Sequence, residues 1–147
     1  MKKHFVLALL TFGLFTGIAS ADIIKKVSAH SVKETMDKFE ALVKSKGMGV
    51  FARVDHTKNA AGVDMKMNDA EVLIFGNPKG GTVLMNKDIA VSLDLPLRVA
   101  VYKDNDGKVW LSYHSPEGLT KNYDVAGVKV IPKVTGALDM LTTAVTK

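Results

Sequence analysis

The chain contains no cysteine at any of its 147 positions. That absence excludes a disulfide framework, cysteine-ligated zinc and iron–sulfur centres, and catalysis by a thiolate. The fold must therefore be held together by packing alone. The chain is long enough to bury one hydrophobic core without covalent or metal crosslinks.

The sequence also lacks a strong excess of one charge. It has 20 basic and 15 acidic residues, a formal net charge of +5, and these residues are spread along the chain. Nucleic-acid binding would require basic residues gathered on one face, so we expect no nucleic-acid partner. After residue 21 no apolar run approaches the roughly 20 residues that span a bilayer. We therefore expect no stable membrane insertion of the processed chain.

The first 21 residues have the pattern of a cleavable export signal. Lys2 and Lys3 precede an apolar stretch over residues 5–18, and Ala19-Ser20-Ala21 supplies the small residues that a signal peptidase accepts. We expect a signal peptide at residues 1–21, cleavage before Asp22 and a periplasmic or secreted protein. Residues 22–147 then form a single domain.

Two segments are expected to be helical. Ser31 and Glu34 have the spacing of a capping box, and a basic residue and a glycine end the segment at 46–47. Between them apolar residues recur at helical spacing: Met36, Phe39, Leu42 and Val43. After Pro132 a second helical face contains Val134, Leu138, Leu141 and Val145.

Five segments are expected to be strands: 23–27, 48–54, 71–75, 97–103 and 108–114. The last two flank Asp106-Gly107, a pair typical of a tight hairpin. Residues 57–62 are expected to form a loop, 63–67 an extended segment, and 82–92 one or two short helical turns. The order β-α-β-β-β-β-α predicts an α+β two-layer sandwich with a mostly antiparallel sheet and its helices on one face.

The segment Gly76-Asn77-Pro78-Lys79-Gly80-Gly81 lies between two apolar runs. Two glycines and Thr82 have the spacing of a nucleotide-binding loop, but Lys79 stands inside the loop rather than before the threonine, which argues against nucleotide hydrolysis. One interpretation is an anion site at a helix N-terminus. The other, which we favour, is a turn that reverses the chain after a buried strand.

Asp55 and His56 form the other polar candidate. A histidine beside a carboxylate is typical of a general base or a metal ligand. Adjacent residues on a strand face opposite sides, however, so a structural role in which Asp55 bonds the loop backbone is favoured. If the ends of the two strands are neighbours, one pocket would be lined by the following residues: Asp55, His56, Gly76, Asn77, Lys79, Gly80, Gly81 and Thr82.

Met65 and Met67 alternate with charged residues, and soft thioethers are ligands that Cu(I) prefers. Met85, His56 and His114 would complete such a copper site. The spacing of two also fits a strand that fills a core with methionine, and this interpretation is favoured.

The motifs together resemble one known family. Asp55-His56, Ala60 to Gly62, the run IFGNPKGGTVLM at 74–85, LDLPLRV at 93–99 and DGKVWLSY at 106–113 are similar to the family called domain of unknown function 302, DUF302. The resemblance implies a TATA-binding-protein-like fold of the order given above and no established activity. This chain departs from the family pattern at His114-Ser115, where relatives have asparagine and aspartate.

No complete catalytic constellation and no cofactor motif is found in the sequence. We therefore expect a non-catalytic binding or accessory module for a small molecule or an anion, with no cofactor. The alternative is a small hydrolase or metal-handling protein that uses His56 with Asp55 or His114. The sequence permits a homodimer.

Overall fold

A five-stranded antiparallel sheet forms the centre of the molecule, in the strand order β1-β5-β4-β3-β2. The computed structural model describes residues 23–147, so the expected signal peptide at 1–21 lies outside the described residues. The strands are β1 (Ile23–Ser28), β2 (Gly49–Asp55), β3 (Ala70–Gly76), β4 (Leu97–Lys103) and β5 (Val109–His114). The two long helices are α1 (Val32–Ser45) and α5 (Val130–Thr146).

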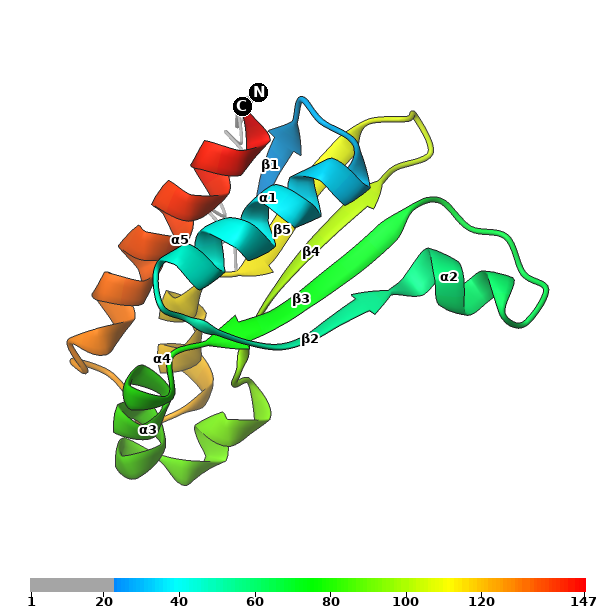
Figure 1. Ribbon diagram of the computed structural model, residues 1–147. Coiled ribbons are helices and arrows are strands. Elements are labelled where there is room, and N and C mark those ends of the chain that lie inside the picture. Colours follow the sequence, from blue (N-terminus) through cyan, green and yellow to red (C-terminus); the bar gives the residue numbers. More distant parts are fainter. Residues whose placement is uncertain (1–22) are drawn as a thin grey trace, which may run out of the picture.

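The long helices α1 and α5 lie side by side on one face of this sheet (Figure 1). Shorter helices follow the strand ends: α2 (His56–Ala61), α3 (Pro78–Lys87) and α4 (Leu119–Asn122), with the 3-10 turns η1 (Ile89–Leu93) and η2 (Pro116–Gly118). The predicted α+β two-layer sandwich is thus confirmed, with its five strands, its two long helices and their order.

Alternation along the strands decides which side chains meet the helices. In β4 the buried residues are Val99 and Val101, whereas Ala100 between them faces the other side and is half-buried. In β5 Val109, Leu111 and Tyr113 are buried in the same way. Successive side chains of a strand point to opposite faces, so one row of each strand packs under α1 and α5. The main core lies between that row and the two helices.

The N-terminus of α1 is capped as expected. The Ser31 hydroxyl accepts a hydrogen bond from the backbone N–H of Glu34 at 3.2 Å, and Gly47, with φ of 70°, follows the C-terminus. The Glu34 carboxylate contacts Lys38 and His30 instead of returning to the backbone of Ser31. The hydrogen bond from Lys38 is the main reason why the pKa of Glu34 is lowered.

The β4–β5 hairpin is organised by Asp104. Its carboxylate accepts hydrogen bonds from the backbone N–H groups of Asp106 and Lys108 and from the indole Nε1 of Trp110, the last at 2.8 Å. These bonds, with that of Trp110 as the largest contribution, lower the pKa of Asp104. Gly107 has φ of 81°, the conformation that the turn requires and that glycine adopts without strain.

Three local expectations differ from the structure. The loop expected at 57–62 is helix α2, because Asp55 caps it by accepting a hydrogen bond from the Lys58 backbone N–H at 2.8 Å. Residues 63–67 form no strand, and Met65 and Met67 are 65% and 46% exposed rather than part of the core. The helical turns expected from Thr82 onward begin earlier, at Pro78.

A second, smaller core lies beyond the sheet end that leads into α3. Its buried members are Leu84, Val91, Val125 and Ile131. They come from α3, η1, the segment before α5 and the first turn of α5. The described residues thus form two cores, and α5 contributes to both of them.

Candidate ligand-binding cavity

The motif GNPKGG forms the cap and first turn of α3 rather than a chain reversal. The side-chain oxygen of Asn77 accepts a hydrogen bond from the Lys79 backbone N–H at 3.0 Å, and Pro78 occupies the first helical position. Proline is well suited there because its missing N–H would have no partner within the helix. The favoured turn interpretation is therefore wrong, and the segment starts a ten-residue helix.

A cavity of about 430 Å³ lies where the two cores meet. Its walls are predominantly apolar and come from the strand ends, from α3, from α5 and from the segments between them. The apolar side chains that line it include Phe51, Phe75, Leu84, Met85, Leu95, Leu97, Val130, Val134, Leu138 and Leu141. Its polar lining comes from Asn77, Thr82 and Ser92.

Small residues of α3 help to keep this cavity open. A Cβ atom placed on Gly80 would meet Val130 Cγ1 at 3.7 Å, and one placed on Gly81 would meet Met85 Cε at 3.8 Å. These are ordinary contact distances, so the first carbon of a side chain fits at either position. A longer side chain at Gly81 would extend into the cavity, which Gly81 lines.

A second hollow of about 290 Å³ adjoins the first, and its lining is more polar. Four residues line both spaces: Leu97, Pro116, Leu119 and Leu138. The remaining lining consists of Asp94, Arg98, His114, Ser115, Gly118, Lys121 and Asn122. Asp94 accepts a hydrogen bond from the Tyr123 hydroxyl at 2.7 Å, and this bond raises the pKa of Tyr123.

The structure divides the predicted site residues into two groups at opposite ends of the sheet. Gly76, Asn77, Gly80, Gly81 and Thr82 line the apolar cavity, whereas Lys79 of the same motif is not in its lining. Asp55 and His56 lie at the other end, because β2 and β3 are antiparallel.

The strand register gives the distance between these two groups of residues. Gly76 pairs with Gly49, and Asp55 pairs with Glu71. At about 3.3 Å per residue, Gly49 and Asp55 are roughly 20 Å apart. The single pocket expected from both groups is therefore not formed. A mostly antiparallel sheet was already predicted, and the antiparallel pairing of β2 with β3 places their C-terminal ends at opposite ends of the sheet.

His56 and His114 are also far apart. His56 follows β2 and His114 ends β5, so three strand spacings, about 14 Å in total, separate their strands. That exceeds any shared metal or hydrogen-bond geometry, so the pairing of His56 with His114 in the hydrolase and metal alternative is not formed. Within residues 23–147 no cluster of three His, Asp or Glu side chains is arranged to hold a metal ion.

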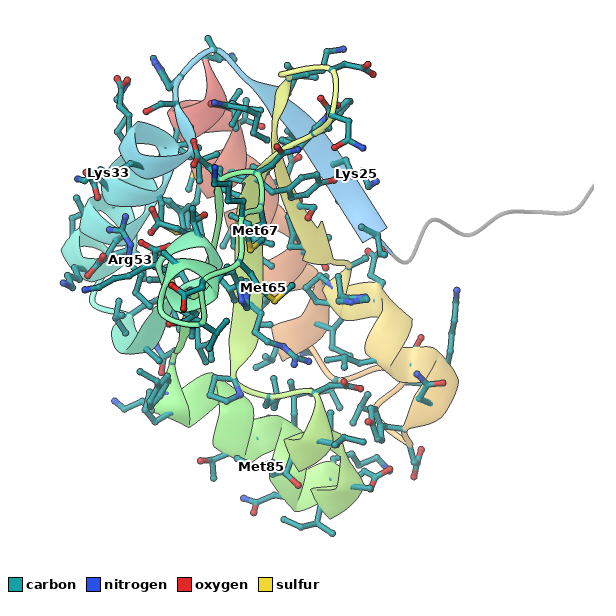
Figure 2. All side chains as sticks on the ribbon, turned by 90° about the vertical axis from the view of Figure 1, so that its right-hand side faces the viewer. Lys25, Lys33, Arg53, Met65, Met67 and Met85 are labelled. Atoms are coloured by element: carbon teal, nitrogen blue, oxygen red, sulfur yellow. The ribbon has the colours of Figure 1, made fainter. Side chains whose placement is uncertain are left out.

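The methionines of the copper alternative do not converge either. Figure 2 shows Met85 on α3 near the lower edge of the molecule, well away from Met65 and Met67. Met85 packs against the smaller core, whereas Met65 and Met67 are exposed. The three thioethers therefore form no common site.

The α5 wall of the cavity was not identified from the sequence. Val130, Val134, Ala137 and Leu138 line the cavity from this helix. Their spacing is that of an amphipathic helix packed on a core, and nothing in the pattern separates a residue that touches a neighbour from one that touches an open space.

A charged cluster beside α1 joins one arginine with three carboxylates. Arg53 on β2 donates hydrogen bonds to Glu71 through Nε, and through Nη1 to Asp37 at 2.7 Å and Glu40 at 3.0 Å. These bonds, led by that to Glu71, raise the pKa of Arg53, so it stays protonated. Figure 2 shows Arg53 beside α1, and none of the four residues lines either hollow. The cluster therefore stabilises the packing of α1 on the sheet.

The fold and cavity together define a small α+β domain with a preformed apolar pocket at one sheet end. A family model for the domain of unknown function DUF302 matches residues 24–145. The chain therefore belongs to the DUF302 family, as its motifs indicated.

A solved structure supports the fold. The crystal structure of an uncharacterized conserved protein DUF302 from Bacillus stearothermophilus superimposes with a TM-score of 0.67. The match covers 86% of this chain and 97% of that one, at 17% sequence identity. At this identity the likeness shows the fold alone.

Curated relatives from Brucella match the chain more closely in sequence. Fluoride-specific ion channel FluC 1 of Brucella suis and its namesake of Brucella abortus are each 38% identical over 122 residues, which is 81% of this chain. The match spans 48% and 45% of their lengths, so this chain corresponds to about half of each relative. Among residues 23–147 no helix has both the length and the apolar character needed to cross a membrane.

Proposed function

We propose that this domain is a non-catalytic binding module for a small apolar molecule. The observation that carries the proposal is the cavity of about 430 Å³ at the GNPKGG motif. Small-molecule sites commonly measure about 300–1,000 Å³ and combine apolar walls with a few polar groups. Five of the residues expected to bind a ligand contribute to this lining. The walls favour an apolar ligand over the small anion that was the other expectation.

The chemistry of the lining supports binding rather than catalysis. None of the described residues around the cavity has a titratable side chain. General acid–base catalysis requires such a group within hydrogen-bond reach of the reacting atom. The polar atoms of Asn77, Thr82 and Ser92 instead provide hydrogen bonds that orient a ligand.

The names of the Brucella relatives suggest a second ligand to test. These proteins are called fluoride-specific ion channels, and this chain corresponds to about half of each. Binding of fluoride by this chain is therefore an alternative to binding of an apolar molecule. The two alternatives predict different ligands in one assay.

Substitution of Gly81 by leucine is expected to weaken binding of the neutral fluorescent probe N-phenyl-1-naphthylamine at least about tenfold. The new side chain would occupy the cavity, whereas its first carbon meets only ordinary contacts. Leucine also favours a helix over glycine by up to about 1 kcal/mol, so the melting temperature should hold or rise. A fluorescence titration and a thermal melt measure the two effects.

Gly136→Leu is the matched control. Gly136 lies on α5 with no atom within 4 Å of a Cβ placed there, so this variant changes helix propensity without filling the cavity. It should bind the probe like the parent. Equal binding by Gly81→Leu and the parent would refute the cavity as the site. A melting temperature raised by sodium fluoride but by no apolar compound would favour the alternative ligand.

We also propose that the protein is exported, because residues 1–21 have the basic, apolar and small-residue order of a signal peptide. N-terminal sequencing of the protein recovered from a bacterial periplasmic extract should begin at Asp22. Recovery only from the cytoplasm with Met1 retained would refute export. A homodimer stays a prediction.

A further inference from the structure

The apolar cavity continues into a hollow of different chemistry. Leu97, Pro116, Leu119 and Leu138 line both spaces, so the two hollows adjoin at these residues. The first space is apolar, and the second is bordered by charged and polar groups. A ligand long enough to touch both would need one apolar part and one polar part.

The polar hollow has an excess of basic groups. Val99 pairs with Tyr113, so Arg98 and His114 occupy the next position on these two strands and lie on the same face of the sheet. Cross-strand neighbours have Cα atoms about 5 Å apart, which brings the guanidinium and the imidazole into reach of one small group. Lys121 borders the same hollow.

Asp94 is the one carboxylate among the described residues of this lining. One of its oxygens already accepts the hydrogen bond from the Tyr123 hydroxyl, and the other lies 3.7 Å from Arg98 Nη2. That second distance exceeds a good hydrogen bond, so the guanidinium keeps donors for another partner. The Arg98 side chain is 52% exposed and the guanidinium is therefore accessible from solvent.

We propose that the ligand is an amphipathic monocarboxylic acid, with its hydrocarbon chain in the apolar cavity and its carboxylate against Arg98 and His114. The inference rests on the function proposed above and assigns the ligand class. Hydrocarbon is stabilised when it leaves water, whereas a buried unpaired carboxylate is costly. A chain in the cavity with its head at the hydrated basic hollow satisfies both conditions. Arginine also matches the planar, two-oxygen geometry of a carboxylate.

Decanoate and decanol, which share a ten-carbon chain, test the assignment. Each compound is titrated against the protein with N-phenyl-1-naphthylamine bound, at pH 7 and low ionic strength, and displacement of the probe gives its affinity. Arg98→Gln should weaken decanoate binding about tenfold and leave decanol binding unchanged, because only the acid has a charged head. His114→Gln should have a smaller effect of the same kind. Arg98→Lys should retain part of the affinity.

Lys58→Gln on α2 is the control, since this exposed lysine lies at the opposite end of the sheet. It should bind both compounds like the parent. A second readout needs no variant: added salt should weaken decanoate binding to the parent and leave decanol binding unchanged.

Two results would overturn the assignment. If decanol competes, but the affinity for decanoate depends on neither salt nor Arg98, the apolar site stands and the carboxylate site is wrong. If neither compound competes and the probe itself does not bind, the proposed function fails together with this inference.

Discussion

Replacement of Phe39 by alanine is expected to lower the free energy of unfolding by about 3–5 kcal/mol. Phe39 on α1 is 0% exposed and meets Phe75 of β3 edge-on, with ring centroids 5.2 Å apart and an interplanar angle of 83°. Removal of the ring deletes this aromatic contact and leaves a space that rigid neighbours fill only in part. Denaturation by urea, followed by circular dichroism, measures the change.

Phe51→Ala is the matched control. The Phe51 side chain is 58% exposed at the rim of the cavity, so its loss should cost less than about 1 kcal/mol. Similar losses for the two variants would contradict the placement of Phe39 at the centre of the main core. Because the helix and strand meet through this pair, Phe39→Ala should also loosen the β3 end that leads into the cavity.

Loss of Arg53 is the second large effect. Arg53→Met should lower the free energy of unfolding by about 2 kcal/mol at pH 7, because Glu71, which is only 8% exposed, would lose its cationic partner. The double variant Arg53→Met, Glu71→Met should recover part of this loss, since no unpaired carboxylate remains. Urea denaturation of both variants measures the two effects. A double variant less stable than the single one would contradict this account.

The same cluster predicts a pH dependence. Hydrogen bonds from Lys33 and then Arg53 lower the pKa of Asp37, and those from Lys44 and then Arg53 lower the pKa of Glu40. Since both folded-state pKa values lie below the ordinary 3.8 and 4.5, these pairs stabilise the protein above about pH 4.5. Their contribution is lost as the pH falls through the lowered values.

Arg53→Met should therefore show a smaller loss of stability between pH 6 and pH 3 than the parent, measured by urea denaturation at each pH. The loss does not vanish, because the lysine contacts remain. Lys58→Met is the control, because this exposed lysine on α2 has no ion pair with Asp37 or Glu40, and its pH profile should match that of the parent. An identical pH profile for Arg53→Met and the parent would contradict the assigned role.

Local patterns were sufficient to predict most of the fold. The serine cap and the spacing of Met36 and Phe39 predicted α1, and Asp106-Gly107 predicted the hairpin, because caps, turns and alternation depend on residues close in sequence. Helix α2 was missed because six residues with little apolar character give no periodic signal. Asp55, which was expected to bond the loop backbone, is its cap.

The candidate site was predicted only in part. GNPKGG was singled out by its composition, and five of the eight expected residues line the cavity. Asp55 and His56 were grouped with them because the ends of the two strands were treated as neighbours. The antiparallel register of β2 and β3 instead places Asp55 and His56 at the opposite end of the sheet. Arg98 was not considered, since an arginine in an alternating strand has no distinctive spacing.

The sequence by itself determined the family and the order of the five strands and the two long helices. These follow from chemistry that acts over a few residues, and from a set of motifs that is ordered along the chain. Only the tertiary structure decided that α3 and α5 stand far enough apart to leave a cavity, and that Arg98 and His114 border the hollow beside it. Such spaces depend on how elements distant in sequence pack together, and no local pattern encodes a gap between them.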